Sequence, residues 1–139
     1  MRRRGTREAD FGALVLDSEG LSGIVAGNRT VLSKLKRARM LGLPVLTSSM
    51  TLVEASHPRG RREAFAWAYS RATVRPVTEE IAKRAMDLLA EARMHGHTHA
   101  IDAVLCATAL DSPKPPLILT SDPDDLAALV GDRAAVLKV

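Results

Sequence analysis

Short apolar runs alternate with longer amphipathic stretches along most of the chain. The short runs predict strands at 13–16, 44–47, 117–120 and 134–139, with a weaker one at 73–77. The longer stretches predict helices at 28–41, 48–57, 60–71, 78–94, 98–110 and 122–130. Strands that alternate with helices and lack an apolar–polar alternation are covered on both faces. The pattern therefore predicts an α/β sandwich built on a parallel sheet.

The helix boundaries follow from capping residues. Asn28, Ser48 or Ser49, Thr78 and Thr98 stand where a side-chain oxygen can accept a hydrogen bond from the first helical turn. In the helix predicted from 28 to 41, the positions expected on the inner side are Val31, Leu32, Leu35, Ala38 and Met40.

Length and composition narrow the class of protein. The chain has 139 residues, of which 46% are hydrophobic and 26% charged, as expected for one globular domain. Its longest apolar runs are far shorter than the roughly 20 residues that span a bilayer, so we expect no membrane association through a helix. The single cysteine, Cys106, excludes an intrachain disulfide and favours a reducing, cytoplasmic setting.

Charge suggests a polyanionic partner. Lys and Arg number 20 against 16 Asp and Glu, which gives a net charge of +4. Four arginines lie in the first seven residues, so we divide the chain into a basic N-terminal tail at 1–11 and a folded domain at 12–139. Only 3% of the residues are aromatic, which disfavours a platform for stacked bases.

Asp102 is the carboxylate that a solvated surface explains least well. It lies inside the apolar stretch 100–106, so we expect it to be largely buried. A buried ionised carboxylate is costly unless it is paired or bound to a metal ion. No Lys or Arg occurs between Met94 and Lys114, although an arginine distant in the sequence remains an alternative partner. We favour a functional role.

Three further carboxylates are expected at the same edge of the sheet. Asp17 and Asp122 directly follow predicted strands, where either would also be an ordinary helix cap. Glu54 lies in a short helix that starts at this edge, with an exposed position as the alternative interpretation. Ligands of parallel sheets bind beyond the carboxyl ends of the strands, and sets of oxygen ligands suit Mg²⁺ or Mn²⁺ rather than zinc. Such ions bind phosphodiesters and lower the pKa of an attacking water.

The rest of the chain is strongly basic once these four acids are set aside. Twelve acidic residues then stand against 20 basic ones. An acidic pocket within a basic chain suits a substrate with a phosphate backbone.

Four segments carry these acids: Val15-Leu16-Asp17-Ser18, Thr51-Leu52-Val53-Glu54-Ala55, His99-Ala100-Ile101-Asp102-Ala103-Val104-Leu105-Cys106-Ala107 and Leu119-Thr120-Ser121-Asp122-Pro123-Asp124-Asp125-Leu126. In this order, over 12–139, they resemble the PIN-domain ribonucleases, and most closely the VapC toxins of bacterial VapBC toxin–antitoxin pairs. No single segment is specific, but the ordered set is fairly specific for the fold and less so for the activity.

The resemblance implies a PIN-like three-layer α/β/α sandwich with a five-stranded, mainly parallel sheet. It implies a divalent-metal-dependent endoribonuclease, the toxin of a type II toxin–antitoxin pair, with one or two Mg²⁺ or Mn²⁺ ions held by Asp17, Glu54, Asp102 and Asp122. Ser18 and Thr120 would assist through their hydroxyls. It further implies an RNA substrate, a homodimer, and a cognate antitoxin whose C-terminal part covers the cleft.

Two points stay open. Asp124 and Asp125 crowd Asp122, so the fourth acid is Asp122 by the Thr-x-Asp pattern, with Asp125 in reserve. The alternative function is a non-catalytic PIN-fold binding or assembly module, which the intact acidic set disfavours. A phosphoacceptor receiver domain would need an acidic pair after the first strand and an aspartate after the third, and the sequence has neither.

The histidines and the cysteine receive other interpretations. His95, His97 and His99 lack the partner ligands of a zinc site, and His99, three residues before Asp102, is expected on the same helical face. For His99, contact with RNA at the rim of the cleft and simple exposure to solvent are the two alternatives. Cys106 is expected to fill the core rather than act as a nucleophile.

Overall fold

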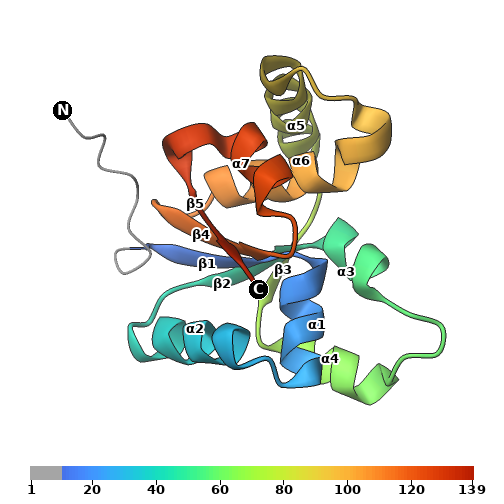
Figure 1. Cartoon of the computed structure of the whole chain (residues 1–139), viewed down its shortest axis with the longest axis vertical. Helices are drawn as coiled ribbons and strands as arrows, with labels where there is room; N and C mark the ends of the chain where they lie inside the picture. Colours follow the sequence, from blue (N-terminus) through green and yellow to red (C-terminus); the bar gives the residue numbers. More distant parts are fainter. Residues whose placement is uncertain (1–10) are drawn as a thin grey trace.

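The computed structural model describes residues 11–139 (Figure 1). Of the basic tail predicted at 1–11, only Phe11 lies within the described residues, and it is buried against the sheet. No helix in this range is long and apolar enough to cross a membrane.

Five parallel strands form one sheet in the order β3-β2-β1-β4-β5. Their bounds are β1 (Ala13–Leu16), β2 (Val45–Ser48), β3 (Thr73–Arg75), β4 (Pro116–Thr120) and β5 (Ala135–Lys138). β1 lies in the middle of the sheet. It pairs with β2, the next strand along the chain, on one side and with β4 on the other. The point where the strand order reverses therefore lies between β1 and β4.

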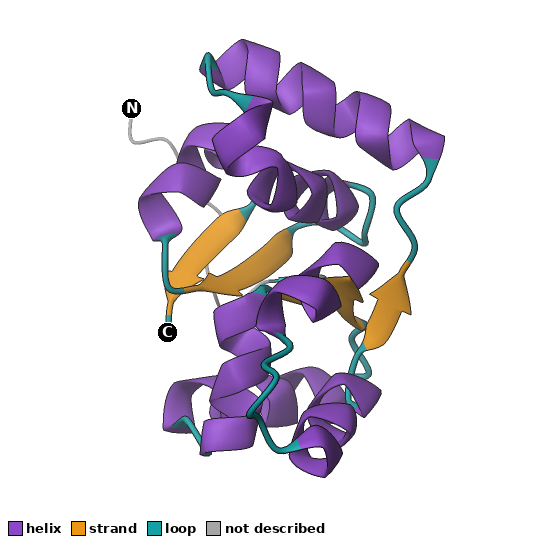
Figure 2. Ribbon diagram, turned by 90° about the vertical axis from the view of Figure 1, so that its right-hand side faces the viewer, coloured by secondary structure: helices purple, strands orange, loops and turns teal. Residues whose placement is uncertain are grey.

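Helices cover both faces of the sheet, which gives three layers (Figures 1 and 2). One face carries α5 (Glu79–Ala92), α6 (Gly96–Leu110) and α7 (Pro123–Val130), and the other α1 (Ser18–Ala26), α2 (Arg29–Met40) and α4 (Arg62–Ser70). The short helix α3 (Ser49–Ala55) contacts both α1 and α6, and a 3₁₀ turn, η2 (Gly131–Arg133), precedes β5. The predicted PIN-like α/β architecture is confirmed.

Alternate residues of the central strands enter the two cores. Ala13 and Val15 of β1 pack under α5, α6 and α7, whereas Leu14 and Leu16 pack against α1, α2 and α4. All four are completely buried. This explains why the strand reads as an unbroken apolar run, because both of its faces are covered.

Helix α1 was not predicted, and its glycines explain the omission. Gly20 and Gly23 weaken the helical pattern of the sequence, but both are buried contact points. A Cβ at Gly23 would lie 2.7 Å from Cγ2 of Val31, and one at Gly20 would lie 3.2 Å from Cβ of Leu16. The glycines therefore let α1 approach β1 and α2 closely. Their low helix propensity also makes α1 hard to recognise in the sequence.

Most predicted caps are confirmed. Asn28, Ser48 and Thr78 each accept a hydrogen bond from a backbone N–H of the following helix. Helix α6 differs, because it begins at Gly96 rather than Thr98 and is kinked at His99. The inner face predicted for α2 is also only partly correct, since Leu32 and Met40 are exposed.

Candidate functional site

A cavity of about 390 Å³ opens at the carboxyl edge of the sheet, beside the point where the strand order reverses. Carboxylates dominate its lining. All four acids predicted from the sequence contribute to its walls, which are formed by Asp17, Ser18, Glu19, Ser22, Glu54, Ala55, Asp102, Ser121 and Asp122. The structure thus brings together residues that lie up to 105 positions apart in the sequence, between 17 and 122.

Asp17 is the most enclosed of these acids, with only 8% of the residue exposed. It follows β1 directly and caps α1, where its Oδ1 accepts a hydrogen bond of 2.8 Å from the Gly20 N–H. Burial raises the pKa of Asp17 to about 6, although hydrogen bonds from Thr120 and the backbone act in the opposite direction. The site therefore holds a carboxylate whose charge is not fully compensated by the chain.

Thr120 links the two strand ends. Its side chain is buried, and its hydroxyl accepts the Asp122 N–H at 2.9 Å while forming a hydrogen bond with the Asp17 carboxylate. The hydroxyl donates its one proton to Asp17 and accepts with a lone pair, so both bonds are satisfied together. Thr120 consequently fixes Asp17 relative to the start of α7.

Asp102 enters the cavity from α6 and is less buried than the sequence predicts. Its side chain is 28% exposed, because the cavity itself opens beside it. Burial raises the pKa of Asp102, and the nearby charges of Glu54, Asp122 and Asp125 raise it further. Glu54 is exposed on α3. The carboxylates thus repel one another across the cavity.

Two aspartates, Asp122 and Asp125, lie where the fourth acid is expected. Asp122 is the exposed N-cap residue of α7 and lines the cavity, and Asp125 lies in the first turn of the same helix. A hydrogen bond between the two side chains raises the pKa of Asp122. Asp125 also lies 3.7 Å from Nδ1 of His99. Both candidates named from the sequence therefore lie at the site.

His99 adds a nitrogen to this group. Its Nδ1 lies 3.9 Å from Oδ2 of Asp102, and one ligand atom from each of His99, Asp102 and Asp125 lies within 4.8 Å of the others. The expected common face with Asp102 is confirmed. The sequence offered this three-residue spacing and named Asp125 as the reserve for the fourth acid, but it gave no sign that Asp125 would approach His99.

The donor set fits a divalent cation. Carboxylate oxygens converge from four separate parts of the chain, and burial together with their mutual repulsion raises the pKa of Asp102. A bound cation would relieve that repulsion. Lysine and arginine do not appear among the lining residues of this cavity in the described part of the chain, so no side-chain cation of the wall neutralises the acids.

Several lining residues escaped the sequence analysis. Glu19 and Ser22 belong to α1, the helix that was not predicted, and Ser121 lies between β4 and α7. The Ser-Glu pair directly after Asp17 is the one sequence signal that could have placed Glu19 at the first turn of a helix.

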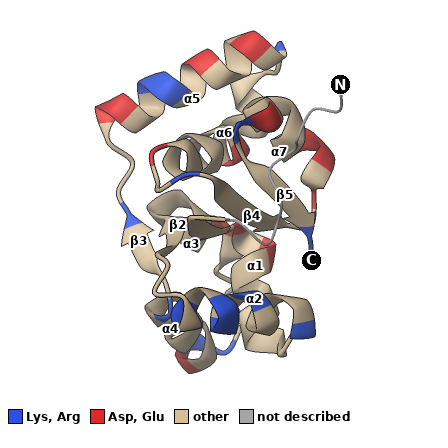
Figure 3. Cartoon of the chain, turned by 90° about the vertical axis from the view of Figure 1, so that its left-hand side faces the viewer, with Lys and Arg blue, Asp and Glu red and all other residues tan. Residues whose placement is uncertain are grey.

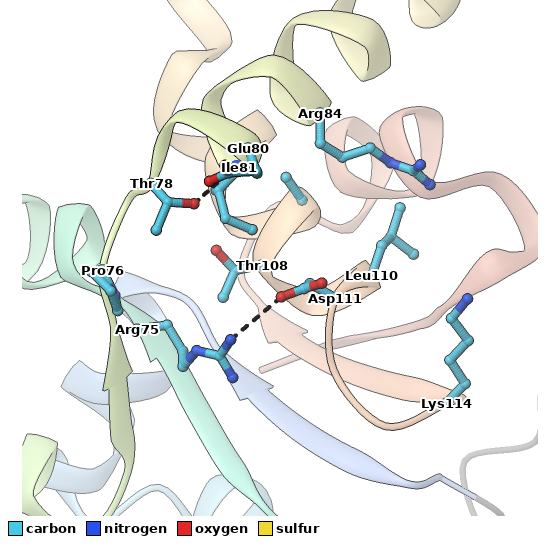
Figure 4. A pocket seen from close by; sticks show the side chains of 11 residues that line it. Arg75, Pro76, Thr78, Glu80, Ile81, Arg84, Thr108, Leu110, Asp111 and Lys114 are labelled. Atoms are coloured by element: carbon cyan, nitrogen blue, oxygen red, sulfur yellow. Dashed lines mark hydrogen bonds and ion pairs between the residues drawn. The ribbon is translucent and has the colours of Figure 1, made fainter.

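A second cavity, of about 500 Å³, lies beside the carboxyl-terminal half of α6 (Figure 4). Both signs of charge line it, with Arg75, Arg84 and Lys114 alongside Glu80 and Asp111. Arg75 and Asp111 form an ion pair of 3.3 Å between partly exposed side chains. Since its charges compensate one another, this cavity lacks the excess of one sign found among the acids.

Similarity to known proteins is found among solved structures and not at the level of sequence. No family model matches the sequence, and no curated protein matches it significantly. Among solved structures, the chain is similar to one in the VapBC2 complex of Rickettsia felis bound to a promoter DNA fragment. The identity is 10%, the TM-score 0.64, and the match covers 91% of this chain and 98% of that one.

Two further structures share the fold. A chain of a toxin–antitoxin complex from Klebsiella pneumoniae is 20% identical, with a TM-score of 0.64 and coverage of 91% and 99%. A chain of FitAB bound to a DNA fragment is 18% identical, with a TM-score of 0.59 and coverage of 90% and 94%. The protein therefore shares its fold with one chain of each of these three complexes, over nearly its whole length.

Proposed function

We propose that the protein is a divalent-metal-dependent endoribonuclease and the toxin of a type II toxin–antitoxin pair. The observation that carries this proposal is the convergence of carboxylates in one cavity at the carboxyl edge of the sheet. The metal ligands in this proposal are Asp17, Glu54, Asp102 and Asp122. Asp125 is the reserve for Asp122.

The proposed roles of the acidic residues follow from how buried each of them is. A divalent cation, Mg²⁺ or Mn²⁺, supplies charge for the scissile phosphate and for the leaving oxygen. Asp17 is held by hydrogen bonds with the Gly20 N–H and Thr120, and so would hold a bound ion in a fixed position. Exposed Glu54 and Asp122 at the mouth can adjust to the substrate as it enters.

An RNA substrate is supported by charge. The chain is basic overall, and α2 carries five basic residues and no acidic one (Figure 3). Such a surface attracts a phosphate backbone at long range, and a bound cation would offset the repulsion between the acidic cavity and the phosphate.

The partners are proposed from the same fold. The neighbours are toxin–antitoxin complexes, which supports a cognate antitoxin that covers the cavity. A homodimer and a cytoplasmic location complete the proposal. The boundary between the basic tail and the domain, at residue 11 or 12, is part of it as well.

A non-catalytic binding module of the same fold is the second candidate. It would retain the architecture without needing acids that repel one another. The raised pKa values of Asp17 and Asp102 argue against it, because a purely structural cavity gains nothing from uncompensated carboxylates.

The test uses the full chain, freed of metal and then supplied with Mn²⁺ or Mg²⁺. Total bacterial RNA is incubated with it, and new 5′ ends are mapped by sequencing. The variant Asp17→Asn keeps an oxygen that can cap α1, so its fold should survive. We expect new ends with the wild type alone, and their loss on addition of EDTA. Equal cleavage by Asp17→Asn, or cleavage that persists in EDTA, would overturn the proposal.

A further inference from the structure

His99 occupies an unusual position in α6. Its backbone angles, φ −124° and ψ 17°, are not helical, and they interrupt the helix three residues before Asp102. The preceding turn is closed by hydrogen bonds from the N–H groups of Thr98 and His99 to the carbonyl of His95. The kink thus gives the imidazole a direction that a regular helix would not.

The imidazole nitrogen Nδ1 is buried without a partner. Among the described residues, it makes no hydrogen bond, although the ring edge is partly exposed. A buried polar atom without a partner is rare, because its desolvation costs roughly 1 to 3 kcal/mol. The structure therefore offers a ring nitrogen that no hydrogen bond in the described chain uses.

The distances around Nδ1 suit a shared cation better than a hydrogen bond. Oδ2 of Asp125 lies 3.7 Å away and Oδ2 of Asp102 lies 3.9 Å away, both beyond the roughly 3.2 Å limit of a good N–H···O bond. Two atoms bound to one ion at about 2.2 Å each are at most about 4.4 Å apart. Both separations fall inside that limit.

We propose that His99, with Asp125 and the cavity residue Asp102, supplies a nitrogen ligand at the edge of the cavity, and that the site therefore selects Mn²⁺ over Mg²⁺. This inference rests on the proposed function, since it concerns the same cation. Imidazole binds first-row transition metals well, whereas Mg²⁺ strongly prefers oxygen. Asp125 acquires a role in this arrangement beside Asp122 rather than in place of it.

The test is Mn²⁺ binding, not activity. Metal-free full-length protein is titrated with Mn²⁺ and, separately, with Mg²⁺, and free Mn²⁺ is followed by electron paramagnetic resonance. The test variant is His99→Ala, and His97→Ala is the matched control because His97 lies in the same turn and is exposed. We expect His99→Ala to weaken Mn²⁺ binding at least about tenfold and Mg²⁺ binding by less than about twofold. His97→Ala should change neither.

A second measurement needs no variant. The electron spin echo of Mn²⁺ bound to the wild type should carry modulation from a ligating ¹⁴N nucleus, and His99→Ala should lose it. Binding without nitrogen modulation, or equal Mn²⁺ affinity in His99→Ala, would overturn the inference. In that case the proposed ribonuclease stands if wild-type protein still cleaves RNA with Mg²⁺. Failure of both cations to bind would overturn the inference and the proposed function together.

Discussion

Helix α6 borders two cavities, and they differ in how charge is arranged. Near its amino-terminal half, Asp102 faces carboxylates from other elements. Near its carboxyl-terminal half, Asp111 meets Arg75 in an ion pair of 3.3 Å. The second cavity is the larger, at about 500 Å³ against 390 Å³. We therefore place the proposed functional site in the cavity with uncompensated charge, and not in the larger one.

Asp102 of α6 and Asp111, the residue that caps the carboxyl end of this helix, test this contrast most strongly. We expect Asp102→Asn to slow RNA cleavage roughly a thousandfold, equivalent to about 4 kcal/mol of transition-state stabilisation, because a metal ligand is lost. Asp111→Asn should change the rate by less than about twofold, since it breaks only an exposed pair. Rates are measured on the cleavage site mapped in total RNA. Similar rates for both variants would remove the distinction between the cavities.

The pH dependence of stability tests the buried acid. Asp17 has a pKa near 6 in the folded protein against 3.8 in the unfolded chain. Because the folded state binds the proton more tightly, stability contributed by protonation is full below pH 3.8 and is lost as pH rises to 6. We expect the metal-free wild type to lose about 3 kcal/mol over this window relative to Asp17→Asn. Denaturant titrations at several pH values measure this difference, and parallel profiles would contradict it.

Thr120→Val tests the link between the two strand ends. Valine keeps the shape but removes the acceptor of the Asp122 N–H and the donor to Asp17. We expect a stability loss of about 1 to 3 kcal/mol and a fall in cleavage rate of about tenfold. The apparent affinity for Mn²⁺ should fall as well. A Thr120→Ser variant, which keeps the hydroxyl, should retain most of both properties.

We expect the smallest change in stability and in RNA cleavage from a substitution in the second cavity. Arg75→Gln removes the partner of Asp111, and an exposed ion pair contributes about 0 to 1 kcal/mol. Thermal unfolding should therefore shift little, and RNA cleavage should be unchanged. A large loss of cleavage would mean that this cavity takes part in binding the substrate.

The sequence predicts the structure best where the pattern of apolar residues along a segment agrees with the place of that segment in the sheet. The strands β1 and β4 are fully buried, so their apolar runs were sufficient to place Asp17 and Asp122 at one edge. Helix α1 was missed because Gly20 and Gly23 serve close packing, a tertiary property that the local pattern hides.

The site was predictable in its residues but not in its geometry. Asp102 drew attention as an acid in an apolar helix, yet its half-buried state depends on the cavity formed by α1, α3 and α7. The approach of Asp125 to His99 depends on how α7 packs beside the kink in α6. Neither contact has a sequence signal of its own, because each joins elements that are distant along the chain.

The proposed function requires that the cavity of carboxylates, and not the larger cavity, holds a divalent cation. Crystals of the full chain soaked in Mn²⁺ and measured near the manganese absorption edge would locate the ion by its anomalous scattering. We expect a peak about 2.2 Å from carboxylate oxygens of Asp17 and Asp102, with none beside Arg75. An empty cavity at saturating Mn²⁺, or a peak only in the Arg75 cavity, would contradict it.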